Sequence, residues 1–209
     1  MARTKPFEDH SIAYEDWFDR NRFVYDSELL AVKAQLPGAG KALEIGVGSG
    51  RFAAPLNIEI GVEPSAAMRS IARDKGITVI GGIAEALPFK ESCFDVTLMV
   101  TTICFVDSVE SSMQESYRVL KQGGSFVVGF IDKDSLIGRT YLKKRDESLF
   151  YGAATFYSLD QIVDYLKKTG FRDLRFSQTV FRPLQQISAI EPVKDGYGEG
   201  SFVVVNARK

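Results

Sequence analysis

From residue 41 onward, short apolar runs alternate along the chain with longer segments in which apolar residues recur at helical spacing. A short run rich in Val, Ile and Phe is typical of a buried strand, and strands that alternate with helices indicate βαβ units and a parallel sheet. The pattern predicts seven strands, over residues 41–47, 58–63, 77–82, 94–100, 125–131, 174–181 and 201–207.

Serine and glycine mark the ends of the predicted helices. Ser65 and Ser158 stand where an N-cap is needed, and Gly76 and Gly170 stand where a helix would stop. A glycine pair at 123–124 closes a third helical pattern in the same way. Helices are therefore predicted over residues 50–56, 65–76, 111–124 and 158–171.

Two other segments lie outside this alternation. Residues 7–36 read as one or two amphipathic helices with aromatic side chains among charged ones, and we expect residues 1–40 to cap the sheet. The turn-rich segment 191–200 is predicted to be a loop.

Length, charge and cysteine usage narrow the class of protein. A chain of 209 residues with 45% hydrophobic residues fits one globular domain. Lys and Arg number 26 against 27 Asp and Glu, so no excess of positive charge is available for nucleic acid or an anionic membrane. The two cysteines are too few for a disulfide framework or a zinc site. No apolar run is long enough to span a membrane, and we expect a cytoplasmic protein without a metal.

The candidate chemistry lies at the end of the first predicted strand, with one acidic residue and three alternate glycines: Glu44, Gly46, Gly48 and Gly50. An open α/β sheet builds its ligand crevice at this end, and glycine permits both positive φ angles and close approach of a ligand to the backbone. An ordinary loop is the alternative. A dinucleotide fingerprint would need a third glycine at the position of Arg51, which disfavours a nicotinamide oxidoreductase.

The spacing E-x-G-x-G-x-G resembles the first motif of class I S-adenosylmethionine-dependent methyltransferases. The strand within 60–68 ends on Glu63, which resembles the acidic residue that accepts both ribose hydroxyls in this family, although a strand-end Glu can also simply cap the next helix. Segments 84–99 and 117–130 resemble the family's later motifs, so the resemblance covers nearly the whole chain. It is nearest to the small-molecule branch, the type of the ubiquinone and menaquinone methyltransferases.

This resemblance implies an α/β fold, a three-layer Rossmann-like sandwich in one methyltransferase domain over residues 1–209. The expected sheet is mixed and seven-stranded, in the order 3-2-1-4-5-7-6 with the last strand antiparallel, under N-terminal capping helices. Residues 132–157 correspond to the place where the family inserts a lid over its site.

The resemblance also assigns expected contacts with the cofactor, S-adenosylmethionine. Glu44 would lie near the methionine ammonium, the glycines under the cofactor, Glu63 on the ribose, residues 83–85 around the adenine, and the backbone at 100–101 at the methionine end. The expected cofactor-binding set is Glu44, Gly46, Gly48, Gly50, Glu63, Pro64, Ile83, Ala84, Glu85, Val100 and Thr101.

Two positions depart from the family pattern. Ile83 stands where an Asp commonly accepts a hydrogen bond from the adenine amine, and Cys104 with Phe105 replaces a frequent pair of histidines. His10 is the only histidine, and it is either a general base or a surface residue of the cap. Cys104 is either a reactive thiol or an apolar wall of the pocket. No catalytic residue is assigned.

The sequence therefore predicts a methyltransferase that acts on an unidentified small molecule by in-line methyl transfer, as a monomer or homodimer and without a nucleic-acid partner. A non-catalytic S-adenosylmethionine-binding sensor or partner subunit remains the alternative, because no base is evident and the adenine-binding Asp is replaced.

Overall fold

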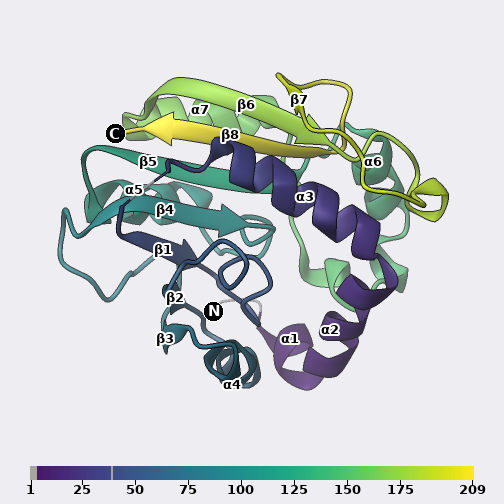
Figure 1. The fold of residues 1–209 in the computed structure, drawn as a ribbon, viewed down its shortest axis with the longest axis horizontal. Helices are drawn as coiled ribbons and strands as arrows, with labels where there is room; N and C mark the ends of the chain where they lie inside the picture. The colour runs from purple at the N-terminus through teal and green to yellow at the C-terminus, as the bar shows by residue number, and fades with distance from the viewer. Residues whose placement is uncertain (1–3, 39) are drawn as a thin grey trace.

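The predicted strands pair in one mixed sheet in a computed structural model that describes residues 4–38 and 40–209 (Figure 1). The sheet has eight strands in the order β3-β2-β1-β4-β5-β8-β6-β7. Their bounds are β1 Ala42–Ile45, β2 Ile60–Val62, β3 Thr78–Ile80, β4 Phe94–Val100, β5 Leu120–Ile131, β6 Arg172–Thr179, β7 Lys194–Asp195 and β8 Phe202–Arg208.

The predicted count of seven strands is wrong by one. The additional strand, β7, has two residues and pairs antiparallel with β6 at the edge of the sheet, within the segment that we expected to be only a loop. Apart from β7, the order agrees with the expected 3-2-1-4-5-7-6, with β8 as the predicted last strand. β1 to β5 pair in parallel, and β8 is antiparallel to both β5 and β6, as expected.

Helices cover both faces of the sheet and give the expected three layers (Figure 1). One apolar cluster joins the sheet to α5 and α7, and a second joins the opposite face to α3 and α4. The α-helices are α1 Lys5–Asp9, α2 Ser11–Arg20, α3 Arg22–Gln35, α4 Ala66–Asp74, α5 Val109–Val119, α6 Leu136–Lys143 and α7 Leu159–Thr169. Short 3-10 helices are η1 Arg145–Glu147, η2 Tyr151–Ala153 and η3 Leu184–Gln186.

The predicted caps of α4 and α7 are confirmed. The Ser65 hydroxyl accepts a hydrogen bond from the Met68 N–H at the start of α4. Ser158 forms a capping box at the start of α7, and Gly170 ends that helix with a left-handed φ of +106°. These short-range signals thus define both ends of α7 and the start of α4.

Two of the predicted helices are corrected by the structure. Residues 51–57 form turns, and Pro55, which lacks an N–H and blocks the preceding turn of a helix, accounts for the difference. α5 ends at Val119, before the glycine pair, because Leu120 already pairs with Phe94 as the first residue of β5. The glycine pair lies inside that long strand.

The N-terminal segment contains three helices rather than one or two, with breaks at His10 and Asn21. α3 packs on β6 and β8, whereas α1 contacts α4 beside the carboxyl ends of the first strands. That residues 1–40 act as a cap and 132–157 as a lid stays a prediction. Among the described residues, no helix is long and apolar enough to cross a membrane.

Candidate functional site

The turn after β1 brings three glycines to the carboxyl edge of the sheet. Gly46, Gly48 and Gly50 have φ angles of +69°, +53° and +82°, which L-residues with a side chain rarely adopt. The N–H groups of Gly46 and Val47 both donate to the carbonyl of Val62 in β2. The glycine turn therefore lies directly beside the end of β2.

The three glycines meet different surroundings. A Cβ at Gly46 would lie 2.3 Å from the Thr102 side chain, and one at Gly50 would lie 2.4 Å from Ile77. A Cβ at Gly48 would have only the Tyr14 hydroxyl within 4 Å, at 3.5 Å. Gly46 and Gly50 thus allow close packing within the protein, while Gly48 leaves space open for a ligand.

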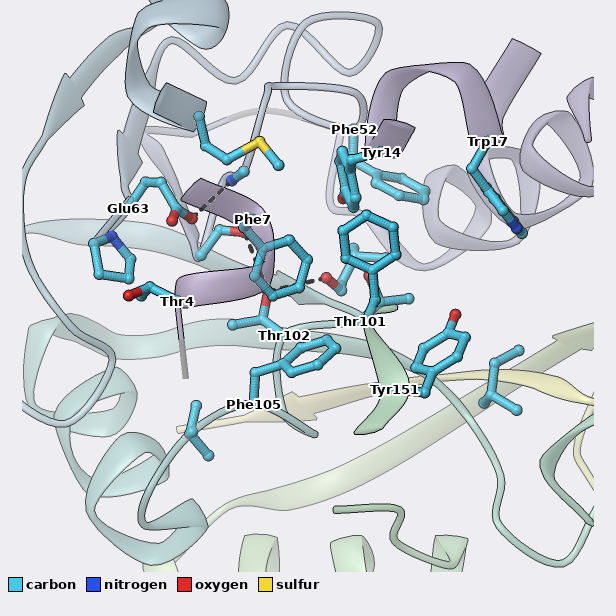
Figure 2. A pocket seen from close by; sticks show the side chains of 18 of the residues that line it. Thr4, Phe7, Tyr14, Trp17, Phe52, Glu63, Thr101, Thr102, Phe105 and Tyr151 are labelled. Carbon is cyan, nitrogen blue, oxygen red and sulfur yellow. Dashed lines mark hydrogen bonds between the residues drawn. The ribbon is translucent and has the colours of Figure 1, made fainter. Parts of the chain in front are cut away.

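Glu63 follows β2 and reaches back to this turn (Figure 2). Its Oε2 accepts from the Gly48 N–H at 3.0 Å, and its Oε1 accepts from the Ser65 N–H at 2.8 Å. Burial raises the pKa of Glu63, although these two hydrogen bonds favour the ionised form. Because each carboxylate oxygen can accept more than one hydrogen bond, both retain acceptor capacity for a ligand.

The end of β4 completes this side of the site. Thr101 has a left-handed φ of +50°, a rare conformation for a residue with a branched Cβ. The hydroxyl of the next residue, Thr102, donates to the Gly46 carbonyl at 3.1 Å. Thr102 is not among the residues predicted from the sequence, because its contact with the glycine turn depends on the pairing of β1 with β4.

A cavity of about 420 Å³ lies over these strand ends, within the usual size of a small-molecule site. Nine of the eleven expected cofactor-binding residues line it: Gly46, Gly48, Glu63, Pro64, Ile83, Ala84, Glu85, Val100 and Thr101. Gly50 and Glu44 do not line it. Gly50 packs on α4, and Glu44 is buried within β1 with no described partner for its Oε2.

Aromatic rings from three parts of the chain close the cavity (Figure 2). The ring of Phe7 in α1 lies 4.8 Å from Phe105, 5.5 Å from Phe150 and 5.7 Å from Tyr14, measured between centroids. Phe150 belongs to the segment predicted to be a lid, and Phe105 follows β4. The N-terminal helices and the 132–157 segment therefore meet over the cavity.

Polar contacts hold the N-terminal helices in this position. The Glu8 carboxylate in α1 accepts from the Ser65 hydroxyl at 2.6 Å, and this hydrogen bond lowers the pKa of Glu8. Glu15 in α2 accepts from the Ser49 hydroxyl and pairs with Arg51 at 3.0 Å. Arg51, the residue that breaks the dinucleotide fingerprint, thus attaches α2 to the glycine turn.

The far end of the cavity is mainly aromatic, and Figure 2 shows Trp17 and Tyr151 on the side away from Glu63. The rings of Tyr141 and Tyr151 stack there at 4.4 Å. Glu28 of α3 also lines the cavity, is only 4% exposed, and has its pKa raised to about 8 by burial. Sequence analysis missed Glu28, although its helical spacing among apolar Val24, Ala31 and Val32 was a usable signal.

Comparisons with known proteins agree with this geometry. A methyltransferase domain model matches residues 43–128. The crystal structure of a SAM-dependent methyltransferase from Thermotoga maritima, a possible histamine N-methyltransferase, has 50% sequence identity and a TM-score of 0.97, and the match covers 99% of each chain. This chain belongs to the S-adenosylmethionine-dependent methyltransferases.

Two further relatives match this chain. An uncharacterised protein of Methanocaldococcus jannaschii is 43% identical over 203 residues, which are 97% of this methyltransferase and 98% of that protein. The ubiquinone/menaquinone biosynthesis C-methyltransferase of Stenotrophomonas maltophilia is 33% identical over 106 residues, which are 44% of this chain and 42% of that protein. The expected family, enzyme class and cofactor are therefore confirmed.

The residues of the methyltransferase site fit S-adenosylmethionine. Gly48 leaves a space that a Cβ would fill. The two carboxylate oxygens of Glu63 are fixed by backbone hydrogen bonds and suit the two hydroxyls of a ribose. The buried Oε2 of Glu44 has no described partner, and burial raises the pKa of this carboxyl well above its ordinary value. Glu44 lies in β1 just before the glycine turn but not on the cavity wall, so the fit to S-adenosylmethionine rests on Gly48 and Glu63.

The two candidate catalytic side chains of the methyltransferase do not line this cavity. His10 is exposed between α1 and α2. Cys104 is half-buried, and its Sγ donates to the Thr101 carbonyl at 3.1 Å, but it is not part of the wall of this cavity. Among the described residues, no cluster of His, Cys, Asp and Glu could hold a metal ion.

Substitutions of the turn glycines should affect ligand affinity and stability differently. We expect Gly48→Ala to lower the affinity for S-adenosylhomocysteine at least tenfold, because the added methyl enters the cavity, and to lower stability only by about 1 to 2 kcal/mol for the left-handed backbone. Gly50→Ala should lower stability more, because it also collides with Ile77. Calorimetry and urea unfolding measure the two effects.

Gly76→Ala is the matched control, since Gly76 has a φ of +86° with nothing within 4 Å of its added Cβ and does not line the cavity. It should share the stability loss of Gly48→Ala and retain full affinity. Equal affinities for Gly48→Ala and Gly76→Ala would contradict the assignment of Gly48 to the ligand site.

Proposed function

We propose that this methyltransferase transfers a methyl group in line from S-adenosylmethionine to a small molecule held at the aromatic end of the cavity. The carrying observation is one cavity that has the glycine turn and Glu63 at one end and Trp17, Tyr141 and Tyr151 at the other. When bound, S-adenosylmethionine would supply a methyl group on a sulfonium, and its leaving group is the neutral thioether S-adenosylhomocysteine.

We propose the cofactor contacts that the family resemblance implies, and the lining of the cavity supports most of them. Glu63 accepts hydrogen bonds from the ribose hydroxyls, Gly48 lies under the cofactor, and Glu44 attracts the methionine ammonium. Ile83, together with Pro64, Ala84 and Glu85, surrounds the adenine, and the backbone at Val100 and Thr101 lies at the methionine end. Gly46 and Gly50 shape the turn from within.

We propose that the protein contributes to the reaction mainly by positioning the nucleophile. An enclosed cavity with aromatic walls can exclude water and hold a nucleophile in near-attack geometry, which supplies a large part of the rate of a displacement reaction. We propose that residues 1–40 and 132–157 are the cap and lid that give this enclosure, since Phe7 and Phe150 stack over the cavity at 5.5 Å.

The acceptor is proposed to be a small molecule rather than nucleic acid, because the chain has a net charge of −1 and the far end of the cavity is apolar and aromatic. We further propose a cytoplasmic enzyme that acts as a monomer or homodimer. The Thermotoga relative, a possible histamine N-methyltransferase, places amines among the acceptors to be tested.

The test is methyl transfer to a panel of amines (histamine included), phenols and carboxylates, with product masses read by mass spectrometry. Transfer to a member of the panel supports the proposal. Tight binding of S-adenosylmethionine without transfer to any acceptor would favour the non-catalytic sensor instead, and transfer to RNA or DNA would overturn the small-molecule assignment.

Glu63→Ala should weaken the binding of S-adenosylhomocysteine by about 1.5 to 3 kcal/mol, which is the scale of hydrogen bonds to a charged group. Calorimetry measures this loss. Glu59→Ala is the control, because Glu59 is an exposed carboxylate just before the same strand. Wild-type affinity in Glu63→Ala would show that the carboxylate does not bind the ribose.

Ile83→Asp tests the adenine end of the site. Ile83 lines the cavity and is 36% exposed, and its side chain cannot pair with the adenine amine. The wild type should therefore discriminate weakly between S-adenosylhomocysteine and its inosine analogue, which carries a carbonyl in place of the amine. Ile83→Asp should increase this discrimination, because the new carboxylate would face the carbonyl of the wrong ligand.

The measured quantity is the ratio of the two dissociation constants in each protein. A ratio that is already large in the wild type and unchanged in Ile83→Asp would mean that Ile83 does not contact the adenine edge.

A further inference from the structure

Glu28 is a buried carboxyl group that the cofactor contacts leave unused. It lies on the inward face of α3, is 4% exposed, and lines the cavity. Among the residues described by the structure, no Lys, Arg or His side chain forms an ion pair with it. Burying such a group without a partner lowers stability, and a functional site is where proteins commonly retain one.

The other charged residues of the cavity wall either form hydrogen bonds with backbone N–H groups or are exposed to solvent. Glu63 is held by two backbone N–H groups, and Glu85 accepts from the N–H groups of Asp107 and Ser108 at the start of α5. Lys144 and Glu147 are exposed. Glu28 is therefore the charged side chain that faces the interior of the far end.

The surroundings of Glu28 suit a cation. Its charge acts on the hydroxyl groups of Tyr14, Tyr141 and Tyr151, whose pKa values are raised mainly by burial and further by Glu28. These tyrosines stay neutral, so they cannot neutralise the carboxylate. Their ring faces attract positive charge, and a cation between aromatic faces and a carboxylate is stabilised by both.

We propose that the acceptor of this methyltransferase is a small amine with an apolar or aromatic body, and that the Glu28 carboxylate binds its ammonium group at the aromatic end of the cavity. The inference rests on the proposed function, since it names the acceptor class of the same site. An acceptor carboxylate would find no buried cationic side chain among the described residues at this end of the cavity.

Glu28 also gives the bound ammonium a destination for its proton. The N–H bond breaks, its electron pair stays on nitrogen as the lone pair of a neutral amine, and the proton forms an O–H bond on the Glu28 carboxylate. In the empty cavity, burial raises the pKa of Glu28 to about 8, and a bound ammonium would favour the ionised carboxylate, which is the form that accepts a proton. A neutral amine is the nucleophilic form that methyl transfer needs.

The test compares amines with their uncharged analogues in the full-length protein saturated with S-adenosylhomocysteine. The probes are 2-phenylethylamine against 2-phenylethanol, and n-butylamine against n-butanol, with phenylacetate as the acid. In the wild type, calorimetry should show that the better-bound amine has an affinity at least tenfold higher than that of its alcohol. Glu28→Gln, which keeps the side-chain shape, should abolish that preference while leaving alcohol and S-adenosylhomocysteine binding unchanged.

Asp26→Asn is the matched control, because it removes one negative charge from the same helix where Asp26 pairs with Arg22 at 3.6 Å outside the cavity. It should keep the full preference for the amine. Glu28→Asp provides a second variant, which should keep the preference at reduced affinity. The Asp variant also serves if Glu28→Gln does not fold.

Three results would overturn the inference while leaving the proposed function intact, provided that S-adenosylhomocysteine binds. They are an amine preference that survives Glu28→Gln, a wild type that prefers the alcohol or phenylacetate, and a wild type that binds neither amine. Failure to bind S-adenosylhomocysteine at all would instead overturn the proposed function.

Discussion

The Glu63 carboxylate joins two segments that are distant in the sequence and determines how the ligand end of the cavity is shaped. It accepts one hydrogen bond from Gly48 in the turn after β1 and one from Ser65 at the start of α4. A buried carboxylate needs such donors, because burial without them is strongly unfavourable. One carboxyl group therefore sets the separation between the turn and the helix start. The open position at Gly48 lies on the turn side.

The N-terminal helices are attached to the same two segments. Glu8 binds the hydroxyl of Ser65, and Glu15 binds the hydroxyl of Ser49 next to Gly48. These contacts bring Phe7 over the cavity, where it meets Phe105 and Phe150. The enclosure thus depends on the geometry around Glu63, and any ligand that shifts the turn would also act on α1 and α2.

The elements that sequence predicted correctly have short-range determinants. Ser158 and Gly170 define α7 within a single stretch of chain, and the glycine turn follows its strand directly. The errors have long-range causes. Leu120 continues into a strand because it pairs with Phe94, and β7 exists only because Lys194 and Asp195 pair with β6. No local pattern distinguishes these positions from a helix end or a loop.

The two ends of the cavity also differ in whether short-range or long-range determinants form them. The end with the glycine turn and Glu63 consists of consecutive strand ends, turns and helix starts, so a motif with constant spacing could predict nine residues of the cavity wall. The other end is assembled from α2, α3, α6 and the segment around η2, and each contributes between one and three lining residues. Tyr141 or Tyr151 taken alone is indistinguishable from a core aromatic, and Glu28 from an ordinary helix acid.

The acceptor preference of such a fold is therefore free to change without any change in the cofactor motif. The Stenotrophomonas enzyme shares 33% identity over 106 residues with this chain, and the overlap is confined to 44% of the chain. The glycine turn can be kept while single residues on α2 or α3 alter the charge of the opposite wall. A carboxylate at position 28 would favour a cationic acceptor, and a neutral side chain of the same shape there would remove that preference.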